Sequence, residues 1–278
     1  MSKKFKFNLI LVFVVCLLCA LCCGSALADE AEESGYPEAP VYVDGMLSCR
    51  GYVINGDVYV SLESVCGILG HDAKTDYDTD TNNLTVSVAG IDITVGAGDN
   101  YMCANGRYLY LSSGYYEING SAVFPVDAVA KIFSLSISRN EENGGVDFGT
   151  ANEAILMSGD EFYNEDDLYW MSRIITWESG NQPVAGQIAV GNVVLNRVDS
   201  ERFPNSIKEV IFQTGQFSPA MNGVIYGDPY EISVVCAKLA LEGYNTVGDA
   251  LFFQVGRYGA VADIATYVCT IGGHNFFK

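Results

Sequence analysis

Residues 173–198 have the sequence RIITWESGNQPVAGQIAVGNVVLNRV, which carries the clearest helical pattern of the second half of the chain. Its first part continues an amphipathic helical pattern, which Gly180 can end. Its second part, residues 184–198, is apolar almost all round and predicts a central helix packed on several sides. Glu178 is the only carboxylate of the stretch, so the sequence places one acid where two buried helices meet.

Glu178 lies on the face of the first helix that the spacing predicts to be buried. Leu168, Met171 and Ile175 recur at i, i+3 and i+7, and Glu178 follows at i+10. Burial without a cation raises the pKa of a carboxyl group, and the C-terminal pole of a helix acts weakly in the same direction. A carboxyl group that keeps its proton at neutral pH can serve as a general acid. The spacing alone equally allows a glutamate turned towards solvent at a fraying helix end.

The rest of the second half alternates capped helices with a polar loop. FPNSIKEVIF (203–212) has Ser206 and Glu209 in capping-box spacing, and DPYEISVVCAKLALEG (228–243) predicts a helix capped by Asp228. GQFSPAMNG (215–223) is rich in Gly, Pro, Ser and Asn and predicts a loop. Two closing segments predict β-strands, residues 250–255 and 267–278.

The first half, residues 41–149, is dominated by Val, Ile, Tyr and Thr runs broken by Asn-Gly and Asp-Gly, which predicts hairpins. INGDVYVSLESVCGILGHDA begins at Ile54, and a similar segment, INGSAVFPVDAVAKIFSLSI, begins 64 residues later at Ile118. Each copy predicts a hairpin strand, a short amphipathic helix and another strand. Residues 29–40 predict an acidic leader and residues 150–163 a polar linker.

Residues 1–28 have the features of a secretory signal peptide, with a basic start, an apolar run and an A-x-A site before Asp29. The formal charge is −19, or −22 once the signal's three lysines, which no acid offsets, are removed. Such a charge disfavours nucleic acid as a partner. No later apolar run is long enough to span a membrane. Five cysteines follow the signal, an odd number that predicts buried free thiols with at most one bridge.

The first half resembles the copper amine oxidase N-terminal-like domain, in its Asn-Gly hairpin, helix and following strand. His71 is its only histidine, so no copper site is predicted, since copper prefers clustered imidazoles or thiolates. The resemblance suggests a wall-binding or spacer module, and a simple stalk is the alternative.

The second half, residues 164–278, resembles the SleB-type cell-wall hydrolase family. The resemblance rests on Glu178, Gly186-Gln187, AVGNVVLNRV, FPNSIKEVIF, QFSP and IGGHNFF in this order. It implies a lysozyme-like fold, cleavage of peptidoglycan between N-acetylmuramic acid and N-acetylglucosamine, and Glu178 as the catalytic residue. Gln182 occupies a place where many members carry a second glutamate. The expected fold class is therefore α+β: a duplicated hairpin and helix domain, then a mainly helical domain with a small sheet.

A single-acid mechanism, that of a lytic transglycosylase, is the expected chemistry. Two-carboxylate glycosidases need a second acid across the bond; Glu201, Asp228 and Glu231 are candidates by position only. The alternatives are a muramidase and a non-catalytic glycan-binding wall protein. The predicted partner is the peptidoglycan glycan strand, and six residues are candidates for the glycan cleft: Gln187, Asn196, Gln216, Phe217, Ser218 and Asn222.

Other hydrolase classes fit the sequence poorly, and no metal or cofactor is predicted. A zinc amidase needs clustered ligands, but the two histidines, His71 and His274, lie in different halves. A Cys/His peptidase needs an activated thiolate. Cys236 lies in the middle of a predicted helix, and Cys269 and His274 are expected on opposite faces of one strand.

Overall fold

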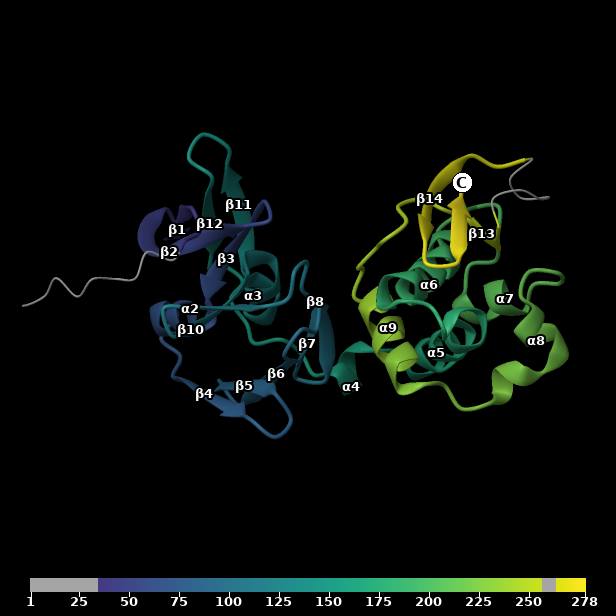
Figure 1. Ribbon diagram of the computed structural model, residues 1–278, viewed down its shortest axis with the longest axis horizontal. Helices are drawn as coiled ribbons and strands as arrows, with labels where there is room; N and C mark the ends of the chain where they lie inside the picture. The colour runs from purple at the N-terminus through teal and green to yellow at the C-terminus, as the bar shows by residue number, and fades with distance from the viewer. Residues whose placement is uncertain (1–34, 257–263) are drawn as a thin grey trace, which may run out of the picture.

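The computed structural model describes residues 35–256 and 264–278. The predicted signal peptide and most of the acidic leader lie outside these residues. The chain forms a β-rich N-terminal half and a mainly helical C-terminal half with a small sheet (Figure 1), which confirms the predicted α+β class. Within the described ranges, no helix combines the length and apolar character needed to cross a bilayer.

The N-terminal half contains two β-sheets, in which most neighbouring strands are antiparallel. The larger has the order β11-β12-β1-β2-β3-β10-β9, and the smaller is a meander, β4-β5-β6-β7-β8. The strands are β1 (Glu38–Val43), β2 (Met46–Ile54), β3 (Asp57–Ser61), β4 (Ala73–Asp78), β5 (Asn83–Val88), β6 (Ile91–Gly96), β7 (Tyr101–Ala104), β8 (Arg107–Tyr110), β9 (Tyr116–Ile118), β10 (Ser121–Pro125), β11 (Ser136–Asn140) and β12 (Gly145–Gly149). The helices are α2 (Leu62–Ile68), α3 (Val126–Ile132) and α4 (Gly159–Phe162).

The sequence repeat appears in the structure as two strand-helix-strand units, β3-α2-β4 and β10-α3-β11. The first strands of the two units pair antiparallel with each other. Val60 pairs with Phe124 in this ladder, and these two residues are equivalent in the repeat because they are 64 positions apart. The duplicated units are therefore related by a local two-fold axis at this pair.

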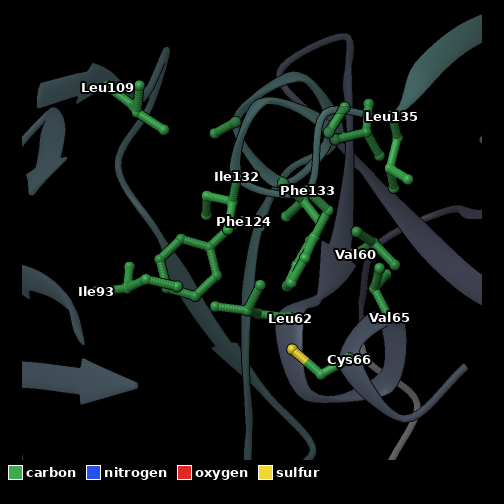
Figure 2. Close-up of a cluster of buried hydrophobic side chains, with 14 of the residues drawn as sticks. Val60, Leu62, Val65, Cys66, Ile93, Leu109, Phe124, Ile132, Phe133 and Leu135 are labelled. Carbon is green, nitrogen blue, oxygen red and sulfur yellow. The ribbon is translucent and has the colours of Figure 1, made fainter. Parts of the chain in front are cut away.

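One apolar core joins the two sheets and both repeat helices. Phe124, Ile132 and Phe133 have no exposed surface, and Leu62 and Ile93 are 1% exposed each. Figure 2 shows these side chains meeting at the centre of the half. Residues at equivalent positions of the two repeat copies, such as Leu62 and Val126, both lie in this core. The repeat therefore predicts part of the core of this half.

The structure differs from the predicted leader and linker at their inner ends. The leader was expected to run to residue 40, but β1 begins at Glu38 and Ala39 is buried in the core. The linker was expected to be solvated, but Leu156 is buried and its amide donates to the carbonyl of Ile132 at 2.9 Å. In both segments a few apolar residues are enough to dock an otherwise polar stretch.

The C-terminal half is built around three long helices, α5, α6 and α9, which pack against one another. The helices are α5 (Glu165–Ser179), α6 (Val184–Val198), α7 (Ile207–Phe212), α8 (Ser218–Asn222), η1 (Val224–Tyr226) and α9 (Glu231–Leu241). The strands are β13 (Phe252–Val255), β14 (Tyr267–Ile271) and β15 (His274–Phe277), in the order β13-β15-β14. The predicted central helix is confirmed with the expected bounds, and so are the Ser206 cap and the closing strands.

Two local predictions in this half are wrong. Residues 218–222 of the predicted loop form α8, because Phe217 and Pro219 are buried and fix the turn by tertiary packing. Asp228 does not cap the next helix, which begins only at Glu231. The amide of Tyr230 instead donates to the Thr176 hydroxyl at 3.1 Å, so the helix start is satisfied from α5.

Candidate active site

Helix α5 presents Glu178 from its last turn, and this turn is braced from several directions. Asn164 caps the start of the helix through a hydrogen bond from the Asp167 amide. At the other end the buried hydroxyl of Ser179 donates to the carbonyl of Ile175 at 2.9 Å. These contacts argue against a fraying end, so the carboxyl group of Glu178 projects from ordered backbone.

Glu178 is half-buried, and burial raises the pKa of its carboxyl group above the ordinary value for glutamate. Desolvation is the only cause of the rise, and no neighbouring charge contributes to it. Over the described residues, no hydrogen bond or ion pair involves this carboxyl group. An acid without a partner in a partly dry position is suited to hold a proton and then to release it.

The three candidates for a second acid lie on the surface. Glu201 and Glu231 are exposed, and the side chain of Asp228 is fully exposed. The nearest cation to Asp228 is Arg173, at 3.8 Å between Oδ1 and Nη2. None of the three contributes to the raised pKa of Glu178. The described part of the site therefore presents one perturbed carboxyl group.

Gln182 ties the segment after α5 to the β14–β15 turn. Its Oε1 accepts a hydrogen bond from the amide of Gly273 at 2.7 Å, and its backbone carbonyl accepts one from Gln187 at 3.0 Å. Gly272 has a φ of +57°, a conformation that residues with a side chain rarely adopt, so this turn favours glycine there. Where the resemblance leads us to expect a second acid, this chain has a neutral side chain that holds two elements together.

Gln187 lies inside the helical core. It is 2% exposed, and its Oε1 accepts a hydrogen bond of 2.7 Å from the hydroxyl of Ser233, which is fully buried on α9. With the bond to Gln182, both ends of the amide are satisfied within the protein. This arrangement links α6 to α9 and to the segment after Glu178.

Asn196 is half-buried near the end of α6, and its amide nitrogen is fully engaged. It donates to the carbonyl oxygens of Gly248 at 2.7 Å and Ala250 at 2.8 Å. The same residue lines a surface hollow with Ser200, Asp249 and others. A binding role therefore competes with a role in anchoring the segment before β13.

Substitution of Asn196 by Ala separates these two roles. We expect the free energy of unfolding to fall by about 1 kcal/mol, because the carbonyl of buried Ala250 loses its donor, whereas that of exposed Gly248 keeps the one from Asn245. The KM for glycan should stay unchanged. Thermal unfolding and steady-state kinetics on the same preparation measure both quantities. A raised KM with unaltered stability would instead place Asn196 in the cleft.

The four remaining cleft candidates surround α8. Gln216, Ser218 and Asn222 are exposed, whereas Phe217 is 2% exposed and belongs to the helical core. The Oδ1 of Asn222 accepts a hydrogen bond from the amide of Val224 at 3.1 Å. The structure thus exposes two polar candidates on α8 and a third, Gln216, just before it, and the buried ring of Phe217 anchors the helix start.

His274, Cys236 and Cys269 do not have the environment that a catalytic nucleophile or its base requires. His274 is 5% exposed on β15, and burial lowers the pKa of its imidazole. Cys269 lies on β14 rather than on the same strand, as had been expected. Burial raises the pKa of Cys236 to about 12. In residues 35–256 and 264–278, no three His, Cys, Asp or Glu side chains come together as a group that could hold a metal ion.

Two partly exposed aromatic residues near the end of α5 were missed by the sequence analysis. Trp177 is 38% exposed, and Tyr230 is 54% exposed with its ring against the backbone of Gly180. Aromatic rings can pack on the apolar face of a sugar. The position of Trp177 next to the acid, on the outer face of α5, was the available signal; the position of Tyr230 depends on the fold.

Comparison with known proteins gives two domain matches. Residues 181–277 match the family described as Cell Wall Hydrolase, and residues 45–147 match the copper amine oxidase N-terminal domain. Glu178 lies just before the first of these matches. Both resemblances seen in the sequence are thereby confirmed.

Curated relatives and solved structures match part of the chain. A spore cortex-lytic enzyme of Bacillus cereus is 36% identical over 91 residues, which cover 33% of this chain and 35% of the relative. That of Oceanobacillus iheyensis is 30% identical over 111 residues, covering 40% and 39%. The chain thus spans little more than a third of these relatives' length. The solved catalytic domain of the germination-specific lytic transglycosylase SleB from Bacillus anthracis is 32% identical, with 42% of this chain and 97% of that chain covered and a TM-score of 0.40.

Proposed function

We propose that this chain cleaves peptidoglycan, at the bond between N-acetylmuramic acid and N-acetylglucosamine, because residues 181–277 match the Cell Wall Hydrolase family. The observation that carries the proposal is the half-buried carboxyl group of Glu178, whose pKa is raised and which ends a braced helix. The curated relatives, named spore cortex-lytic enzymes, support the same substrate class.

In the proposed mechanism Glu178 acts first as a general acid. Its carboxyl proton passes to the glycosidic oxygen while the bond from that oxygen to the muramic acid C1 breaks. The departing strand leaves as an alcohol, and Glu178 is left as a carboxylate. Positive charge then develops at C1, and the neighbouring carboxylate stabilises it.

The same carboxylate then acts as a base towards the sugar's own 6-hydroxyl group. It takes the hydroxyl proton as the oxygen attacks C1, which gives a 1,6-anhydromuramic product and restores the acid form of Glu178. The attacking group is already tethered to the substrate, so no second carboxylate is needed to position a water molecule. The surface positions of Glu201, Asp228 and Glu231 favour this single-acid route.

Analysis of the products tests the transglycosylase outcome. Digestion of purified peptidoglycan should release fragments whose muramic acid ends lack one water molecule relative to hydrolysed ends, as measured by mass spectrometry. Fragments with ordinary reducing ends would show a muramidase instead. A wall-embedded gel adds a second readout, because binding without clearing would indicate a non-catalytic glycan-binding protein.

We further propose that the enzyme acts outside the cytoplasm, on cell wall or spore cortex. The secretory signal predicted for residues 1–28 and the names of the curated relatives support this location. Rates on purified cortex and on vegetative sacculi, compared at equal glycan concentration, distinguish the two substrates. Faster release from cortex would assign the enzyme to the spore.

A further inference from the structure

The two halves of the chain meet at a buried carboxylate. Glu242 follows the last turn of α9, and its side chain is 2% exposed. Arg107 on β8 donates to both carboxylate oxygens at 2.6 Å, and the ammonium group of Lys131 on α3 lies 2.7 Å from Oε2. The hydroxyl of Tyr163 donates to Oε1 at 2.9 Å. We call these four residues the Glu242 clasp.

The clasp holds one carboxylate between two cations in a specific geometry. Burial by itself would raise the pKa of Glu242, but hydrogen bonds from Arg107, Lys131 and Tyr163 and the charge of Lys131 outweigh it, so the pKa is lowered. A bidentate pair with arginine fixes orientation as well as distance. Because the Arg107 side chain is only 8% exposed, loss of its partner would leave a charge stranded in a dry position.

Further contacts surround the clasp along the same seam. The rings of Tyr110 and Tyr244 stack with centroids 3.6 Å apart, and the ammonium group of Lys238 on α9 donates to the carbonyl of Gly106 at 3.1 Å. Tyr101 and Tyr108 pack against the helical core of the C-terminal half. Figure 1 shows α9 on the side of this half that faces β8. The seam thus combines apolar packing with buried charge, unlike a flexible connection between independent domains.

We propose that the N-terminal half is a fixed part of the enzyme body, locked to α9 by the Glu242 clasp, and not a mobile stalk. The end of α9 is therefore a docking surface, and its partner is the β7–β8 hairpin with α3 of the same chain. Since Tyr230 precedes α9 and lies against Gly180 near Glu178, the helix that is clasped at one end borders the candidate site at the other. The inference does not depend on the proposed activity, because its test requires no substrate.

The test compares the full chain with its Glu242→Ala variant by small-angle scattering and calorimetry. We expect the unaltered protein to scatter as one rigid particle and to unfold in one transition. The variant should show a larger radius of gyration and two separate transitions. Glu38→Ala is the matched control, because Glu38 pairs with Arg50 at 2.8 Å on the surface, and it should behave like the unaltered protein.

A second variant covers the case in which Glu242→Ala does not fold. Lys131→Met removes a partner that is 38% exposed and leaves the bidentate pair with Arg107 intact, so the chain should fold. In this variant the two unfolding transitions should separate only partly, and the radius of gyration should rise less than in Glu242→Ala. Independent domain motion in the unaltered protein, or scattering that neither variant changes, would overturn the proposal.

Discussion

The Glu178→Gln variant is expected to lose peptidoglycan cleavage, with kcat about 10²–10⁴-fold lower than in the unaltered enzyme. This is the range that a positioned general acid contributes. Glutamine keeps the size and the hydrogen-bonding ends of the side chain but has no proton to transfer. Release of soluble fragments from sacculi under single-turnover conditions measures the loss, and the products expected from the unaltered enzyme should be absent.

Stability distinguishes a catalytic loss from an unfolded variant. Burial makes the pKa of Glu178 higher in the folded chain than in the unfolded chain. The ionised form therefore favours unfolding, and this cost grows as pH rises from the unfolded pKa through the folded pKa. Removing the charge should leave the melting temperature at neutral pH equal or higher. A lower melting temperature would indicate that Glu178 has a structural role.

Glu201→Gln is the matched control for this substitution. Glu201 is a surface glutamate of the same half, and we expect the variant to keep close to full activity. A loss as large as that of Glu178→Gln would point to a pair of carboxylates and to hydrolysis by a muramidase. The control therefore tests the single-acid mechanism as well as the specificity of the effect.

The parts of this fold that the sequence predicts well are those whose signals are local. The bounds of α6 follow from an apolar pattern preceded by Pro183. The start of α7 follows from Ser206 and Glu209: the Ser206 hydroxyl accepts from the Glu209 amide at 3.3 Å and donates to the Glu209 carboxylate at 3.0 Å. The repeat also predicts the strand-helix-strand units, since equivalent residues such as Val60 and Phe124 carry the same core role.

Features set by distant contacts could not be predicted. Helix α8 depends on burial of Phe217, which composition does not reveal. The late start of α9 depends on the Thr176 hydroxyl, 54 residues away. Arg107 and Glu242, 135 residues apart, give no sign of pairing in a single sequence. The spacing left open whether Glu178 is buried or faces solvent, and both its half-buried position and its lack of a partner became visible only with the fold.

The pH dependence of cleavage gives the second large effect. The reaction begins from protonated Glu178, whose pKa is raised by burial. Above that pKa the reactive fraction falls tenfold for each pH unit. We expect kcat/KM to show one limb, which declines on the alkaline side and begins at a higher pH than an ordinary glutamate would give. Initial rates across the pH range, with glycan concentration far below KM, measure this limb.

The shape of the profile separates the possible mechanisms. A carboxylate pair would add an acid limb, because its second member must be ionised, and the curve would be bell-shaped. Burial lowers the pKa of His274 towards the acid range, so the position of the limb does not by itself distinguish His274 from Glu178. The His274→Gln variant makes the distinction: we expect it to keep the alkaline limb, because that limb belongs to Glu178. If the decline instead began where a solvated glutamate ionises, burial of Glu178 would not be what prepares it for catalysis.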